Sequence, residues 1–331
     1  MPLEDSKRAF AVFTIVQDEP EFIHPWINHY KKHVVEARDL YVLVHAPTGS
    51  DGRLMTAEML PAWHRAQSLL TSCHNVTLIP VHHSAAYDHR WLADTVGRFQ
   101  SFLLSSYSWV LFAEVDEFVL PISKRTSGAT LLDFVRSLGD APPPAIRASG
   151  FEVVQQPDEA AVPSHLYNDG GNVGLTAADL MRGCRFWHRS EGYSKTVLAN
   201  VPVRWGLGFH QIDMPADSLL QGVATGVPSP SVALVHLHKV DFALALGRSR
   251  RGRARMGSSF DIEHRLGWQN RIDDAAELRA YWDMDVSAAK PLDKASLEPI
   301  EEGVRQALGD PLGSGRRFRP FSYFRLMGRT N

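Results

Sequence analysis

The sequence contains little cysteine and no long apolar run. Cys73 and Cys184 are the only cysteines among 331 residues, which excludes a disulfide framework, and no C-x-x-C pair is present to bind zinc. No stretch approaches the roughly 20 apolar residues that a membrane-spanning helix needs. The opening residues, MPLEDSKRAF, lack the apolar segment of a signal peptide. We therefore expect a soluble protein of the reducing cytoplasm.

The chain also lacks a strong charge of either sign. It has 35 Lys and Arg against 37 Asp and Glu, a formal net charge of −2, which argues against a general nucleic-acid-binding protein. The hydrophobic share of 44% is that of an ordinary globular protein. The length permits one large α/β domain or two smaller ones.

The most informative stretch is WVLFAEVDEFVLP, residues 109–121. Its apolar part does not alternate with polar residues, as in a strand buried on both faces of a parallel sheet. Glu114, Asp116 and Glu117 follow at once, and three neighbouring carboxylates repel one another and are costly to desolvate. Glu114 and Asp116 lie on one side of an extended backbone, where they can share a divalent cation. The alternative is a strand that ends in solvated acids.

Strand and helix patterns alternate up to this stretch. Apolar, largely β-branched runs predict strands at residues 10–16, 40–44, 76–81 and 110–113, and amphipathic patterns predict helices at 22–33, 55–70 and 91–107. The alternation predicts a mainly parallel sheet with right-handed crossovers. Ligands bind such sheets beyond the carboxyl ends of the strands. The polar residues that follow three strands are therefore expected on one rim, at positions 17–19, 45–52 and 114–117.

The second half of the chain is less regular. Strands are predicted at residues 146–154, 184–187, 195–198 and 232–240, and helices at 275–282 and 297–308. Between them, arginines alternate with glycines and serines in residues 247–260. Few apolar residues could anchor this stretch, so it reads as a mobile basic loop.

Three passages resemble the family-2-like glycosyltransferases of the GT-A fold, including the bacterial relatives of the family-92 group. They are FTIVQDEPEFIHPWINHY, the helix from Arg98 with WVLFAEVDEFVLP after it, and VHLHKVDF. The resemblance covers about residues 10–121 and is patchy to about 245. It implies a Rossmann-like, mainly parallel mixed sheet flanked by helices, with a C-terminal helical extension. The implied division is a glycosyltransferase domain at 1–245 (nucleotide- and metal-binding half 1–121, acceptor-side half 122–245), then a basic loop and helical extension at 246–331.

The resemblance implies a hexosyltransferase-type enzyme that moves a sugar from a nucleotide-sugar donor, expected to be a UDP-sugar, to an acceptor hydroxyl or amine with inversion. Mn²⁺ or Mg²⁺ would bridge the two phosphates and neutralise the leaving nucleoside diphosphate. By position, Asp116 is the best metal ligand and Glu114 replaces the first aspartate of the family motif. His236 is a third candidate ligand, with His238 on the same side of its strand. Glu117 either supports this site or faces the acceptor.

The resemblance also places residues near the donor. Asp18 and Glu19 would lie near its base or ribose, and Lys195 and His210 near its phosphates. The family's second strand ends in an aspartate that contacts the nucleotide, whereas this chain has Ala46. Each candidate can also be an ordinary surface or core residue. The full set of donor-binding candidates is Asp18, Glu19, Asp51, Arg98, Lys195 and His210.

An inverting transferase needs a general base to take the proton of the acceptor. The candidates are Glu191, Asp213 and Asp169, and we favour Glu191 because it lies beside Lys195 in SEGYSK. The arginines of residues 248–255 read equally as a lid over the donor diphosphate or as a solvated loop.

Two other functions stay open. A catalytically degenerate relative that binds a sugar or a partner without turnover is favoured by Ala46. A sugar nucleotidyltransferase would need a glycine-rich basic loop after the first strand, whereas residues 17–20 are acidic and end in proline.

Overall fold

The computed structural model describes residues 7–288 except 50, 52, 54, 56–60, 73–74, 85, 123–128, 157–160, 162–174, 182–183, 185, 213–227, 256 and 268–270. The first half of this region forms four parallel strands, as the alternating pattern predicts. Their spatial order is β3-β2-β1-β4. The strands are β1 (Arg8–Val16), β2 (Leu40–Thr48), β3 (Thr77–Ser84) and β4 (Tyr107–Phe112).

The second half of the described chain continues the same sheet to nine strands. After β4 the order is β8, β6, β9 and β5, with β7 beside β6. Only β6 and β9 are parallel to each other in this half, and the other pairings are antiparallel. The strands are β5 (Glu117–Pro121), β6 (Ala145–Val154), β7 (Phe186–Arg189), β8 (Thr196–Ala199) and β9 (Ser229–Lys239). The acidic stretch thus joins the parallel half to the mixed half, at the junction between β4 and β5.

Helices cover both faces of the sheet, which makes the protein an α/β fold. Alternate residues of β1 serve the two faces: Phe10 and Val12 pack with α1 and α2, and Ala11 and Phe13 pack with α3. The first face carries α1 (Pro20–Tyr30), α2 (Pro61–Ser72), α4 (Leu131–Arg136) and α6 (Ala177–Met181), and the second carries α3 (His89–Leu103) and η3 (Leu207–Phe209). A short turn of helix, η1 (Ala37–Asp39), precedes β2.

Helix α1 holds the acidic junction in place. Proline at its start suits the first helical turn, and Phe22, Trp26 and Tyr30, spaced four residues apart, are buried along one side. The Tyr30 hydroxyl donates to the carbonyl of Glu117 at 3.0 Å and accepts from the amide of Val119 at 2.9 Å. The start of β5 is therefore tied to α1 by side-chain as well as sheet contacts.

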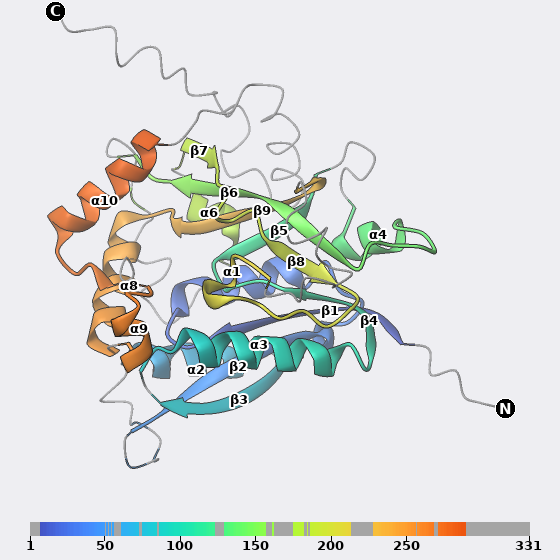
Figure 1. The fold of residues 1–331 in the computed structure, drawn as a ribbon, viewed down its shortest axis with the longest axis horizontal. Helices are drawn as coiled ribbons and strands as arrows, with labels where there is room; N and C mark the ends of the chain where they lie inside the picture. The colour runs from blue at the N-terminus through green and yellow to red at the C-terminus, as the bar shows by residue number, and fades with distance from the viewer. Residues whose placement is uncertain are drawn as a thin grey trace, which may run out of the picture.

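The prediction of a mobile basic loop at residues 247–260 is wrong. Residues 242–255 form α8 (Phe242–Arg255), followed by α9 (Ser259–Glu263) and α10 (Ala275–Ala288). The buried carboxylate of Asp241 accepts the amide of Leu244 at 2.9 Å and so caps the start of α8. These three helices are drawn in orange, grouped at one edge of the molecule (Figure 1). The predicted helix at 297–308 lies outside the described residues.

Several element boundaries also differ from the prediction. Strand β2 runs on through Pro47, which pairs with His83 of β3, so the predicted loop begins later than residue 45. Helix α2 begins at Pro61 in the described chain. Among the described residues, no helix is both long and apolar enough to cross a bilayer.

Histidine burial beneath α1 makes stability sensitive to acid. Burial lowers the pKa of His33 to about 3, and its Nδ1 accepts the amide of Leu131 at 3.1 Å. Between pH 6.5 and 3 the unfolded chain therefore binds a proton that the folded chain does not, so stability is lost as pH falls through this window. From pH 7 to pH 5, His33 should therefore lower the free energy of unfolding by about 2 kcal/mol. His33→Asn keeps a hydrogen-bond acceptor but does not titrate in this range. Its free energy of unfolding, measured by urea titration at pH 7 and pH 5, should therefore fall by about 2 kcal/mol less than that of the wild type. Exposed His64→Asn is the control, and an unchanged pH dependence in His33→Asn would contradict the prediction.

Candidate metal and donor site

Two of the three polar stretches predicted to share one rim, those that follow β1 and β4, lie at the same end of the parallel strands. Strands β1, β2 and β4 run in one direction, with Val16 paired to Val44 and Phe13 to Phe112. The segments that follow β1 and β4 therefore leave the sheet on the same side. Asp18, at 4% exposure, and Asp116, at 4%, are both buried there.

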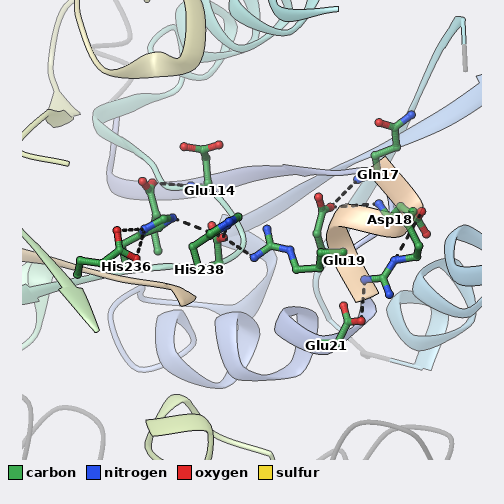
Figure 2. Close-up of polar contacts among 12 residues, drawn as sticks. Gln17, Asp18, Glu19, Glu21, Glu114, His236 and His238 are labelled. Atoms are coloured by element: carbon green, nitrogen blue, oxygen red, sulfur yellow. Dashed lines mark hydrogen bonds and ion pairs between the residues drawn. The ribbon is translucent and has the colours of Figure 1, made fainter. Parts of the chain in front are cut away.

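Asp116, His236 and His238 form a compact group of possible metal ligands. One side-chain ligand atom from each lies within 4.8 Å of the others. Asp116 Oδ2 is 3.5 Å from His236 Nε2 and 3.7 Å from His238 Nδ1. The histidines are alternate residues of β9, and their rings lie nearly parallel with centres 5.6 Å apart. Figure 2 shows them side by side. One carboxylate and two imidazoles suit Mn²⁺ better than Mg²⁺, which prefers oxygen ligands.

The surroundings of this group fix its charge. Glu152, from β6, lies 3.1 Å from His236 Nδ1, and the ring of Tyr193 stacks on His236 with 3.8 Å between centres. Burial lowers the pKa of His236, but Glu152 and Asp116 outweigh it and raise that pKa to about 10. Burial also raises the pKa of Asp116, and Arg248 and His236 outweigh it, so this pKa is well below its usual range. Without a bound metal, Asp116 is an anion compensated by side-chain cations.

Glu114 does not join this group. Its carboxylate is 2.8 Å from the ammonium of Lys195, which is also 2.7 Å from Glu117. The expectation that Glu114 and Asp116 share one side of an extended strand is wrong, because the amide of Glu117 donates to the carbonyl of Glu114 at 3.0 Å and closes a turn. Lys195, at 1% exposure, is buried in ion pairs with these two carboxylates. Burial raises the pKa of Glu117 to about 7, against the lowering effect of Lys195.

Three arginines of α8 face the acids of the rim. Arg248 is 2.9 Å from Asp116, and Arg251 is 2.7 Å from Glu21. Arg251 and Arg255 also lie 3.9 and 3.8 Å from Asp18. We call Arg248, Arg251 and Arg255 the arginine face. Its spacing of three and four residues is that of one helix face, a signal that the glycines and serines of this stretch obscured.

The two acids after β1 have different roles. Burial raises the pKa of Asp18 to about 6, outweighing Arg255 and Arg251. The carboxylate of Glu19 instead accepts the amides of Gln17 and Asp18, at 3.4 and 3.1 Å, and so fixes the turn into α1. Both residues are seen at the far end of the rim from His236 (Figure 2).

Other predicted residues are placed less favourably. Arg98 is 80% exposed and pairs with Asp94 on α3; it lies nine residues into a helix that leads away from the rim, so the structure does not bring it to the site. Asp51 is 62% exposed and pairs with Arg53. Glu191 is 71% exposed and pairs with Arg189 at 3.3 Å, so its catalytic role stays a prediction.

Of the remaining predicted residues, His210 and Ala46 lie in the described chain. The Nδ1 of His210 is 2.7 Å from the carbonyl of Gly192, and its ring lies edge-on to Tyr193, the residue that stacks on His236. Ala46 is a buried residue of β2. Asp169 and Asp213, proposed as general bases, lie outside the described residues. Glu152 and Tyr193 were not predicted, since nothing in the sequence links either to His236.

No protein-family model matches this chain, and no curated protein matches it in sequence. Among solved structures, the mannosyltransferase PcManGT from Pyrobaculum calidifontis, determined with GDP-Man and Mn²⁺, is 13% identical over 91% of this chain and 81% of its own, with a TM-score of 0.36. TarS 1–349 from S. aureus is 8% identical over 90% of this chain and 81% of its own, with a TM-score of 0.28. A longer TarS chain is 14% identical over 47% of this chain, with a TM-score of 0.22, and this chain spans 23% of its length. These similarities are too weak to assign a function, which has to be inferred from the residues of the site.

Proposed function

We propose that this protein is a metal-dependent glycosyltransferase that transfers a sugar from a nucleotide donor, a UDP-sugar, to an acceptor hydroxyl or amine with inversion of configuration. The observation that carries the proposal is the group formed by Asp116, His236 and His238, whose ligand atoms lie within 4.8 Å of one another. It lies at the carboxyl ends of the parallel strands, where α/β sheets bind ligands. The arginine face lies beside it and carries guanidinium groups of the kind that bind anions.

The residues of the chain divide the work of such a reaction. Asp116, His236 and His238 would hold Mn²⁺, once His236 has given up the proton that Glu152 and Asp116 stabilise on it. The ion would supply Lewis-acid stabilisation of the leaving diphosphate. Glu152 orients the ring of His236 through Nδ1. Arg251 and Arg255 lie next to Asp18, where they can approach a phosphate or ribose.

The proton of the acceptor needs a base, which we assign to one of Glu191, Asp213 and Asp169. Glu191 is the one of the three that lies in the described chain, in the turn next to Tyr193. Its carboxylate pairs with an exposed arginine at 3.3 Å and is itself 71% exposed, so it has access to solvent and to an incoming acceptor.

Calorimetry with UDP tests the proposed function. UDP should bind at least about tenfold more tightly with Mn²⁺ than with EDTA, because an ion held by the ligand group would supply positive charge to the diphosphate. A UDP-sugar should then release UDP when incubated with enzyme and Mn²⁺. Metal-dependent UDP binding without any turnover across UDP-sugars and acceptors would favour the catalytically degenerate alternative. The presence of Ala46 in place of the family's aspartate is the sequence feature that supports this alternative. If neither UDP nor GDP shows binding that depends on metal, the proposed function is wrong.

A further inference from the structure

The side chain of Arg248 lies against the same oxygen of Asp116 that the ligand group depends on. Its Nη1 is 2.9 Å from Oδ2, the atom that also lies nearest the two imidazoles. Both side chains are largely buried, Arg248 at 15% and Asp116 at 6% exposure. The guanidinium also lies over the ring of Phe22, 4.9 Å from its centre. The guanidinium therefore contacts Asp116 and the ring of Phe22.

A divalent cation and this guanidinium compete for Oδ2. Two like charges within about 4 Å repel strongly in a partly desolvated site. A metal ion on Asp116 must therefore displace Arg248 from it. Equally, the guanidinium supplies the positive charge that a buried carboxylate needs while no metal is bound.

An arginine that leaves Asp116 needs another anion. After Asp116, the acids whose charges also favour the guanidinium are Glu19 and Glu21, and Glu21 is already paired with Arg251 at 2.7 Å. One oxygen of Glu19, Oε2, accepts the two amides of its own turn. A donor diphosphate would supply the missing partner, in the bidentate geometry that a guanidinium favours.

We propose that Arg248 is an internal cation that occupies the metal position of Asp116 in the ligand-free protein and binds the donor diphosphate when metal and nucleotide arrive. The inference rests on the proposed function and adds a coupling to it. Metal alone must break the Arg248–Asp116 pair without compensation and binds weakly. Metal together with a nucleoside diphosphate replaces both halves of that pair, so the two ligands bind cooperatively.

Mn²⁺ titration in the absence of nucleotide is the direct test, with free Mn²⁺ followed by electron paramagnetic resonance. Arg248→Gln should bind Mn²⁺ roughly 5- to 150-fold more tightly than the wild type, the usual range of such couplings. Arg248→Met, which keeps a side chain over Phe22, should behave likewise. Arg250→Gln, an exposed arginine of the same helix, is the matched control and should leave Mn²⁺ affinity unchanged.

Repeating the titration with saturating UDP separates the two proposals. UDP should strengthen Mn²⁺ binding in the wild type by a larger factor than in Arg248→Gln. If UDP strengthens Mn²⁺ binding in the wild type but both Arg248 variants match it without nucleotide, the inference fails and the proposed function stands. If the wild type binds no Mn²⁺ even with UDP or GDP, both fail. Thermal unfolding with and without Mn²⁺ checks folding: a variant that binds should gain melting temperature from Mn²⁺ alone.

Discussion

Asp116→Asn should lower the release of UDP from UDP-sugars at least about a hundredfold, since a bound metal contributes several kcal/mol of charge stabilisation in the transition state. The substitution keeps the size of the side chain and removes only its charge. Metal-dependent UDP binding in calorimetry should vanish with it. The expectation follows from the central position of Asp116 Oδ2, which faces His236, His238 and Arg248.

Asp140→Asn is the matched control, because it makes the same chemical change at an exposed position away from the ligand group. It should leave turnover and UDP binding unchanged. Undiminished turnover in Asp116→Asn would show that Asp116 is not a required metal ligand, and the proposed mechanism would then be wrong.

Lys195→Met should lower the free energy of unfolding by about 3–5 kcal/mol, the usual cost of removing one partner from a buried charge pair. Lys195 is 1% exposed, and its ammonium lies 2.8 Å from Glu114 and 2.7 Å from Glu117. Without it, two carboxylates of one turn face each other with Glu117 fully buried. Urea unfolding measures the effect.

Two companion variants make the interpretation specific. Lys195→Met with Glu117→Gln should be less destabilised than the sum of the single changes, because the unpaired charge is removed together with its partner. Lys31→Met, at an exposed lysine, should change stability by less than about 0.5 kcal/mol. A loss below about 1 kcal/mol in Lys195→Met would contradict the view that this lysine holds the turn together.

Most of the fold could be predicted from local patterns. The apolar runs located the four parallel strands of the first half, and their alternation with helices implied a common rim, because those signals depend on residues close in sequence. Helix α8 was missed for a physical reason: its glycines and serines have low helix propensity, and its arginines are held by Asp116, Glu21 and Asp18, acids more than 100 residues earlier in the chain.

The candidate site divides in the same way. Asp116 and His236 could be chosen from the sequence, because clustered acids after a core strand and alternate histidines in a strand are local signals. Only the tertiary structure decided that His238 rather than Glu114 stands beside them. The turn from Glu114 to Glu117 directs Glu114 towards Lys195, and the pairing of β5 and β6 with β9 places His236 between Asp116 and Glu152.

By itself, then, the sequence determined the α/β architecture, the rim and the presence of an acidic junction in need of a cation. The tertiary structure decided which side chains surround Asp116. Carboxylates, imidazoles and guanidinium groups form pairs according to their distance in space. Strand pairing brings His236 to Asp116, and one helix face places Arg248 beside Asp116 and Arg251 near Asp18.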